Sequence, residues 1–413
     1  MQKACAVVHN LHNRVCGLPP DNMSTRFLHT ADWQLGKPFA GVEEDDKRVL
    51  VQQERFNVLR RIGQAAIDQR AEFVLIAGDL FDSPTPKRAT VSATCSAIGV
   101  MRVPVYPIPG NHDYAGPGSL WEQEFFRHEW QQLAPNLHLL LKAEPVVLEQ
   151  AVIFPCPLLR RHEAIDPTTW LRSPNLDLTR FGDKPRVVLA HGSVQGFAAL
   201  ESDEEDAGGG LPNQIDLDRL PGETFDYIAL GDWHGAKKVG PKAWYSGTPE
   251  LDRFSKGGDH APGKVLAVNA RRGGLPEVEP FTTAHLGWHE VEFHFADDTA
   301  LAQLEERVVA LIGGRASQDL LQLRLSGVLG IEATTKLEMK LEAWRARLLR
   351  LKLANEPIIA PSQTEMEALR NRPYDPLISR VSAKLLAAAN AGGEEAAVAR
   401  IALRELYAAC QPR

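Results

Sequence analysis

Residues 227–235, YIALGDWHG, form an apolar run that ends in a glycine, an aspartate and a histidine. Side chains two residues apart in an extended segment point to the same side, so Asp232 and His234 can contact the same metal ion. Four other short apolar runs also end in polar clusters: RFLHTAD (26–32), EFVLIAGD (72–79), VPVYPIPGNHD (103–113) and RVVLAHGS (186–193). The sequence therefore predicts five β-strands that carry polar side chains at their ends.

Segments long enough to form helices separate these runs. The clearest is 43–70, where apolar residues such as Phe56, Leu59 and Ile62 recur near helical spacing with charged residues between them. Alternation of strands and helices predicts an α/β sheet with helices on its faces. Ligand sites of such sheets lie at the carboxyl ends of the strands, so we expect the five polar clusters to converge on one site.

The expected site is rich in oxygen and imidazole donors and contains no thiolate. Its candidate ligands are Asp32, Gln34, Asp79, Asn111, His191, Asp232 and His234. This donor set suits manganese, magnesium, iron or zinc rather than an ion that prefers sulfur. Seven donors exceed the needs of one catalytic ion, but they suit two ions that share a bridging carboxylate, the usual device for hydrolysing phosphate esters.

The composition sets wider limits. A chain of 413 residues that is 44% hydrophobic and 24% charged is typical of a globular protein with two or three domains. No uncharged apolar run is long enough to predict a membrane span. The five cysteines are scattered without a CxxC pair, which argues against a disulfide framework or a zinc ribbon and fits a reducing cytoplasm. A net charge of -7 gives no general attraction to nucleic acid.

Five motifs carry a family resemblance. TADWQLG, GDLFD, GNHD, HGS and GDWHG, in this order, resemble the signature motifs of the calcineurin-like binuclear metallophosphoesterase superfamily. The layout is similar to the SbcD-type DNA repair exonuclease branch, and the motifs extend from residue 26 to about residue 254. The resemblance implies an α/β fold: a metallophosphoesterase β-sandwich flanked by helices, then a small α+β capping domain and a C-terminal helical hairpin.

The same resemblance suggests domain boundaries. Independently of the resemblance, residues 1–22 contain neither a signal-peptide core nor an arginine-rich amphipathic pattern, so we expect either a disordered extension or a stretch outside the natural protein, with Met23 as the natural start. Residues 23–282 would form the catalytic domain and 283–358 the capping domain. Residues 359–413 would form a helical segment that docks a partner, although packing of these helices against their own domain is an equal alternative.

The resemblance also implies two ligand sets that share Asp79 as the bridging carboxylate. The first ion would lie among Asp32, Gln34, Asp79 and His234. The second ion would lie among Asp79, Asn111, His191 and Asp232. His112 would stand beside the scissile phosphate, stabilising its charge and helping to protonate the leaving oxygen, with Asp113 available to orient it.

Two positions depart from the family pattern. Gln34 and Asp232 each stand where the family usually has histidine. A neutral glutamine binds metal more weakly than imidazole, so the first ion should be held more loosely. An aspartate at position 232 favours manganese or magnesium over zinc. Asp232 could instead turn away and cap the following turn.

The resemblance implies a metal-dependent phosphodiesterase that cuts DNA as an exonuclease or endonuclease of DNA repair. Its cofactor would be two divalent ions, most simply Mn2+, with Mg2+ or Fe2+ as alternatives, and a metal-bound hydroxide would attack the phosphate. DNA and an SbcC-like coiled-coil ATPase would be its partners; a homodimer is left open, and no membrane is involved. The alternatives are a small-nucleotide phosphodiesterase or phosphatase, which would not need the tail after residue 282, and a catalytically weakened DNA-repair scaffold.

Two weaker signals bear on the substrate. YSGTPELDRF (245–254) resembles the segment that lines the nucleic-acid groove in the SbcD branch, although a plain strand and turn would explain it equally well. The densest basic cluster of the tail contains Lys336, Lys340, Arg345, Arg347, Arg350 and Lys352. This cluster predicts either a DNA-facing stripe or a solvated helix face with intervening glutamates.

Overall fold

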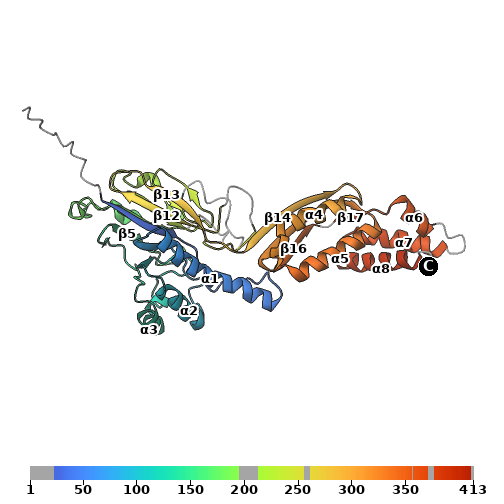
Figure 1. The fold of residues 1–413 in the computed structure, drawn as a ribbon, viewed down its shortest axis with the longest axis horizontal. Helices are drawn as coiled ribbons and strands as arrows, with labels where there is room; N and C mark the ends of the chain where they lie inside the picture. Colours follow the sequence, from blue (N-terminus) through green and yellow to red (C-terminus); the bar gives the residue numbers. More distant parts are fainter. Residues whose placement is uncertain (1–22, 195–212, 255–260, 356, 371–375, 411–413) are drawn as a thin grey trace, which may run out of the picture.

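A computed structural model describes residues 23–194, 213–254, 261–355, 357–370 and 376–410. The expected extension at 1–22 lies outside the described residues. The molecule is elongated, with the strands and helices of its first half at one end and the C-terminal helices at the other (Figure 1). Within the described ranges, no helix combines the length and the apolar character needed to cross a membrane.

Two mixed sheets dominate the described part of residues 23–282. The first has the strand order β13-β12-β1-β2-β3, with bounds Glu277–Thr282, Lys264–Arg271, Ser24–Thr30, Phe73–Ile76 and Val105–Pro107. The second has the order β10-β11-β9-β6-β5-β4, with bounds Lys237–Lys238, Ala243–Tyr245, Tyr227–Gly231, Arg186–His191, Val152–Cys156 and Val146–Val147. Strands β1, β2 and β3 are parallel to one another, and so are β5, β6, β9 and β11.

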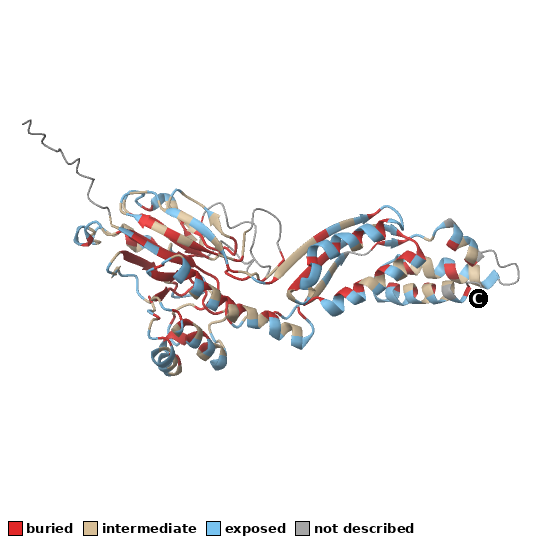
Figure 2. Ribbon diagram, viewed as in Figure 1, coloured by how far each residue is buried: buried red, intermediate tan, exposed pale blue. Residues whose placement is uncertain are grey.

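The two sheets pack face to face. Phe27 and Leu75 of the first sheet share a buried cluster with Val187, Leu189 and Tyr227 of the second. The rings of Phe27 and Tyr227 meet edge to face, with centroids 5.5 Å apart. Buried residues therefore line these strands, as Figure 2 shows. The expected β-sandwich is confirmed.

Helices cover the outer face of the first sheet. They are α1 (Asp45–Asp68), α2 (Arg88–Gly99) and α3 (Glu124–Leu133). Leu59 and Ile62 of α1 pack with Val74 and Ile76 of β2 in one buried cluster. The helix predicted for residues 43–70 is thus α1, and the outer face of the second sheet is covered mainly by short 3-10 turns and loops.

A second core follows in the β14–β17 unit. Its strands are β14 (Gly287–Phe295), β15 (Asp319–Leu329), β16 (Arg350–Asn355) and β17 (Ile358–Ile359), and its helices are α4 (Ala300–Ile312) and α5 (Ile331–Arg347). Every strand that pairs with β15 runs parallel to it, so α4 and α5 are crossover helices. Leu304 of α4, Leu323 of β15 and Trp344 of α5 share its buried cluster.

An apolar junction joins this unit to the sandwich. Phe254, Leu286 and Leu320 pack there with Val51 of α1, and Trp288 packs against them. The Phe254 and Trp288 rings meet edge to face with centroids 4.9 Å apart. The first turns of α1 accordingly extend toward β16 in Figure 1.

The described C-terminal segment contains three helices: α6 (Gln363–Arg370), α7 (Pro376–Ala389) and α8 (Glu394–Cys410). The antiparallel α7–α8 pair corresponds to the expected hairpin, whereas α6 was not expected. Ala399 and Leu403 lie in the buried cluster of this segment, but Leu377 and Val398 are 65% and 68% exposed. Exposed and buried residues therefore alternate along these helices (Figure 2).

Candidate metal centre

The polar clusters converge as expected at the carboxyl ends of parallel strands from both sheets. Asp32 follows β1, Asp79 follows β2 and Asn111 follows β3. His191 ends β6, and Asp232 follows β9. The site therefore lies where the ends of the two sheets meet, and its side chains come from segments far apart in the sequence.

The backbone at these positions is unusual. Asp32, Gln34, Asp79 and Asp232 have φ values of 53°, 42°, 54° and 104°. Residues other than glycine rarely adopt positive φ because the side chain then crowds the backbone. Two ladder-like hydrogen bonds hold the turn, from the Asp32 N–H to the Gly78 carbonyl (3.1 Å) and from the Gln34 N–H to the Asp79 carbonyl (2.9 Å). Strain concentrated in this way is typical of functional sites.

Three buried side chains form the centre of the cluster. The ligand atoms of Asp32, Asp79 and His191 all lie within 4.8 Å of one another. Burial raises the pKa of Asp32, and the neighbouring carboxylates of Asp79 and Asp232 raise it further, against the opposing effect of His191. Concentrated negative charge out of water requires a compensating cation.

The ring of His191 is oriented for ligation. Its Nδ1 lies 2.8 Å from the Ala77 carbonyl, to which it donates, and this fixes Nε2 as the atom facing the cluster. Nε2 lies 2.9 Å from Asn111 Oδ1, 3.6 Å from Asp79 Oδ1 and 3.8 Å from Asp232 Oδ1. A nitrogen lone pair and three oxygens facing one another need either a proton or a metal ion between them.

The charge of His191 supports the same conclusion. Burial opposes its protonation, but the carboxylates of Asp79, Asp32 and Asp232 outweigh burial and raise its pKa to about 9. The carboxylates thus draw positive charge into the cluster. A divalent cation held by carboxylate, amide and imidazole groups supplies that charge, so these residues fit a metal ion.

Asp232 faces this cluster and does not cap the following turn. The Ser193 hydroxyl donates to Asp232 Oδ2 at 2.6 Å, which directs Oδ1 toward His191. The Asp232 N–H in turn lies 3.2 Å and 3.3 Å from the two carboxylate oxygens of Asp32. Asp232 therefore lies beside the other candidate ligands, and its role as a metal ligand stays a prediction.

Two glycines allow the cluster to close. A Cβ atom on Gly78 would lie 2.2 Å from His191 Nδ1, and one on Gly110 would lie 2.2 Å from Asp79 Oδ1. Gly78 also has a φ of 92°, which favours glycine. The glycines of GDLFD and GNHD are therefore required by the close approach of the candidate ligands.

His112 lies at the edge of the cluster and is half-buried. Its N–H donates to Asp79 Oδ1 at 2.9 Å, and its ring Nδ1 lies 2.9 Å from the Asp82 carbonyl. Burial lowers the pKa of His112, but the Asp79 carboxylate and the Asp82 carbonyl outweigh it, so the net pKa is raised. The opposite ring nitrogen, Nε2, is left to donate to a bound group.

The structure corrects the role expected for Asp113. Its two carboxylate oxygens accept the N–H groups of Gly110 (2.7 Å) and Phe81 (3.1 Å), so this side chain is 1% exposed and closes a turn. The His112 ring is oriented by the Asp82 carbonyl instead. Asp113 therefore supports the loop that carries Asn111 and does not contact the imidazole.

Gln34 and His234 make a separate set of contacts from those of Asp32, Asp79 and His191. Gln34 Oε1, the only side-chain atom of this residue that suits a metal, accepts from Lys37 Nζ at 2.8 Å. Lys37 also donates to Asp252 Oδ2 at 2.7 Å, and His234 Nδ1 lies 3.1 Å from the same carboxylate oxygen. These two expected ligands are engaged by protein groups, so their arrangement does not fit a metal ion.

Sequence reasoning missed several residues that shape the site. Lys37, Asp252 and Asp82 contact the expected ligands or His112 directly, and Arg55 donates to the carbonyls of Trp33 (2.6 Å) and Glu250 (2.7 Å) from a position that is 2% exposed. Asp252 belongs to the segment 245–254, which the sequence marked only as a groove. The sequence offered one signal for Arg55: it is a charged residue at a position of α1 where the apolar spacing predicts burial.

A family match is consistent with this geometry. The family model described as Calcineurin-like phosphoesterase matches residues 25–259, more than half of the chain. The crystal structure of TT1561 of Thermus thermophilus is 13% identical, with a TM-score of 0.37, and the match covers 63% of this chain and 99% of that one. A second crystal structure is 12% identical with the same TM-score, covering 63% of this chain and all of the other.

Proposed function

The chain belongs to the calcineurin-like phosphoesterase family and is a metal-dependent phosphoesterase, and we propose that its substrate is DNA. The proposed activity is that of an SbcD-type nuclease of DNA repair in the cytoplasm, with manganese as the metal. The observation that carries the phosphoesterase chemistry is the buried group of Asp32, Asp79 and His191 at the strand ends. Oxygen donors outnumber imidazole there, which favours manganese or magnesium.

The protein residues divide the work of hydrolysis. A divalent ion, when bound, polarises the phosphate and lowers the pKa of water at the site. Asp32, Asp79, Asn111, His191 and Asp232 would hold that ion. A second ion, which the family resemblance implies, would need the position of Gln34 and His234.

His112 would act on the leaving group. Its raised pKa favours the protonated ring, and the Asp82 carbonyl holds Nδ1, so Nε2 carries the proton that faces outward. A protonated imidazole at this position can stabilise the charge on the phosphate and protonate the leaving oxygen of DNA. Both roles suit a substrate with a poor leaving group.

DNA as the substrate is supported by the β14–β17 unit. A cavity of about 530 Å³ lies between the start of α1 and this unit, and its charged lining consists of Arg345, Arg350 and Lys352 together with Glu43 and Glu44. The first half of the predicted basic stripe is engaged within the unit, because Lys336 pairs with Glu332 and Lys340 with Glu305. The proposed DNA contact is therefore limited to the basic groups at the end of α5 and in β16.

A coiled-coil ATPase is the proposed partner at the opposite end of the molecule. Leu377 of α7 and Val398 and Ile401 of α8 are 65%, 68% and 53% exposed, and they are large apolar side chains. Figure 1 places these helices far from α2 and α3. A partner bound there would leave the candidate metal centre open to DNA.

We expect His112→Ala to cleave DNA in manganese about 10²- to 10⁴-fold more slowly than the wild type, because general acid assistance is lost. The variant should lose much less activity on a nitrophenyl phosphodiester, because that leaving group needs no proton and only the stabilisation of the phosphate charge is lost. Labelled single- and double-stranded DNA and the chromogenic ester measure the two rates. His128→Ala, an exposed histidine on α3, is the matched control.

Other outcomes select the alternatives. Wild-type protein that hydrolyses small nucleotides or the nitrophenyl ester but no DNA would be a small-substrate phosphodiesterase. Protein that binds DNA and hydrolyses none of these substrates, with or without its ATPase, would be a scaffold. Equal losses of His112→Ala on DNA and on the nitrophenyl ester would contradict the leaving-group role.

A further inference from the structure

Four side chains beside the group of Asp32, Asp79 and His191 form a closed ring of polar contacts. Lys37 Nζ donates to Gln34 Oε1 (2.8 Å) and to Asp252 Oδ2 (2.7 Å). His234 Nδ1 lies 3.1 Å from the same Asp252 oxygen, and His234 Nε2 lies 3.4 Å from Gln34 Nε2. The ring runs from Asp252 through Lys37, Gln34 and His234 back to Asp252.

The lysine fixes the orientation of the Gln34 amide in this ring. An ammonium group has no acceptor, so Gln34 must present its oxygen to Lys37 and its NH2 group to His234. His234 Nε2 then accepts from the amide, and Nδ1 faces the Asp252 carboxylate. The amide oxygen and the Nε2 lone pair, the two atoms suited to a metal, are thereby used within the ring.

A second cation lies against the same imidazole. The guanidinium of Arg253 approaches His234 Nδ1 to 2.9 Å and Nε2 to 3.3 Å, and its Nε lies 3.5 Å from Asp252 Oδ1. Asp252 is 6% exposed, so water screens these charges weakly. Two fixed cations beside His234 oppose the entry of a divalent ion.

The neighbouring cluster has the opposite character. Asp32, Asp79 and Asn111 present oxygens toward His191 Nε2, and no Lys or Arg ammonium or guanidinium is paired with these three side chains among the described residues. One half of the site thus has no paired lysine or arginine among the described residues, while the other half contains one of each.

We propose that this centre holds one divalent ion, with Asp32, Asp79, Asn111, His191 and Asp232 as its ligands. The Lys37 ammonium supplies the positive charge that a second ion would otherwise supply. The inference rests on the proposed function in one respect: that the ion held here is the catalytic metal. Lys37 is a positioning residue here: it holds Gln34 and Asp252, and through them His234. The two-ion centre implied by the family resemblance is revised accordingly.

Counting ions tests the proposal on the full-length protein. Each protein is stripped with a chelator, loaded with manganese, desalted and analysed for metal and protein. The wild type and the charge control Lys336→Ala, an exposed lysine paired within α5, should each retain about one ion per chain. Gln34→His combined with Lys37→Ala restores a second imidazole and removes the ammonium, and should retain about two ions.

Electron paramagnetic resonance gives a second readout that is independent of catalysis. The wild type should show the spectrum of isolated Mn2+, and the double variant that of two coupled ions. Two retained ions with a coupled spectrum in the wild type would overturn the proposal, and so would a folded double variant that still holds one ion. Titration with manganese should show a weaker second site in Lys37→Ala alone. The proposal can therefore still be contradicted if the double variant fails to fold.

This test is separate from that of the proposed function. Metal counts and spectra involve no substrate, so a wild type with one ion and no activity on DNA supports the one-ion centre and contradicts the nuclease. A wild type that holds two ions and cleaves DNA supports the nuclease and contradicts the one-ion centre.

Discussion

Replacing Asp79 by asparagine is expected to lower phosphodiester hydrolysis by about 10³-fold or more while the fold is kept. Asp79 lies at the centre of the site: its Oδ1 is 3.6 Å from His191 Nε2 and accepts the His112 N–H at 2.9 Å. The substitution removes one of the two buried carboxylates of the three-residue centre, so the metal is bound more weakly. A metal contributes several kcal/mol to transition-state stabilisation, and ~4 kcal/mol corresponds to roughly 10³ in rate.

Asparagine is the informative replacement because of the backbone. Asp79 has a φ of 54°, a conformation that asparagine tolerates about as well as aspartate and alanine does not. Asp79→Asn therefore removes the charge without adding backbone strain. Activity, manganese content and circular dichroism are measured beside Asp177→Asn, which changes an aspartate in an exposed loop. Activity within tenfold of the wild type, with normal metal content, would show that Asp79 holds no catalytic metal.

Most of the fold follows from local sequence patterns. All five predicted strands are present and end at or shortly before their polar clusters, because an apolar β-type run followed by polar residues indicates where a buried strand stops. Helix α1 was predicted within two residues at each end from its apolar spacing. Parallel strands bring their carboxyl ends together, so the convergence of Asp32, Asp79 and His191 was predictable from the order of elements alone.

The partners of the site residues were not predictable in the same way. Asp113 follows His112 directly in the sequence, yet its carboxylate faces the N–H groups of Gly110 and Phe81. The ring of His112 is oriented by the backbone carbonyl of Asp82. Every residue has such a carbonyl, so the sequence does not indicate which one contacts the ring. Motif matching identifies which residues reach the site, whereas hydrogen-bond direction decides what each of them does there.

Gln34 illustrates the same limit. Its departure from the family pattern suggested a weaker metal ligand, which is a statement about one side chain. The structure adds Lys37, three residues later, and Asp252, more than two hundred residues later, and these two residues determine where the amide oxygen points. A substitution at one ligand position is therefore interpretable only together with the side chains that face it.

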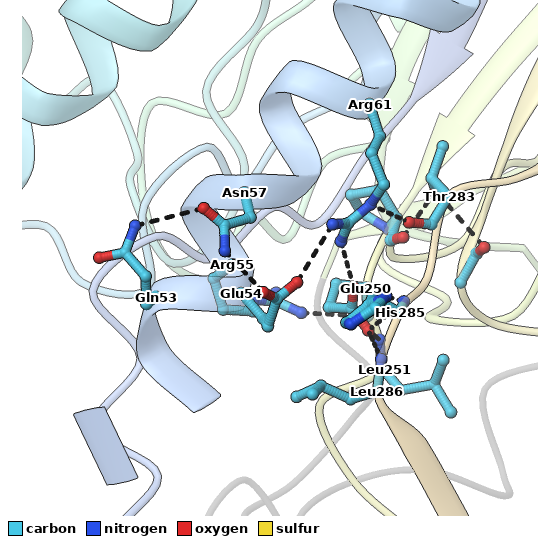
Figure 3. A network of polar contacts seen from close by, with 12 residues as sticks. Gln53, Glu54, Arg55, Asn57, Arg61, Glu250, Leu251, Thr283, His285 and Leu286 are labelled. Atoms are coloured by element: carbon cyan, nitrogen blue, oxygen red, sulfur yellow. Dashed lines mark hydrogen bonds and ion pairs between the residues drawn. The ribbon is translucent and has the colours of Figure 1, made fainter. Parts of the chain in front are cut away.

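A buried glutamate connects the site to the β14–β17 unit. Glu250 is fully buried and pairs with Arg61 of α1 at 2.6 Å. Its carboxylate also accepts the N–H groups of His285 and Leu286, in the connection that leads to β14 (Figure 3). Arg61 donates from Nε to the Thr283 carbonyl in the same network. One carboxylate thus fixes α1, the segment after β11 and the connection between the two cores.

We expect Glu250→Ala to lower the free energy of unfolding by about 3–5 kcal/mol, because it removes the acceptor of two buried N–H groups and the closer carboxylate partner of Arg61. A loss of that size corresponds to a fall of about 6–20 °C in the thermal midpoint of a domain this large. Glu250→Gln keeps one acceptor oxygen and should lie between the variant and the wild type. Thermal unfolding followed by circular dichroism measures all three.

Glu54→Ala is the matched control, because Glu54 pairs with the same Arg61 at 3.1 Å but lies at the surface of the network, with 17% of its side chain exposed. Partly exposed ion pairs contribute roughly 0–1 kcal/mol, so this variant should unfold within a few degrees of the wild type. If both alanine variants had the same midpoint, the stabilising contact would be the ion pair with Arg61 rather than the N–H groups of His285 and Leu286. A large difference locates the stabilisation in the acceptor role of Glu250, and hence in the connection that positions the β14–β17 unit.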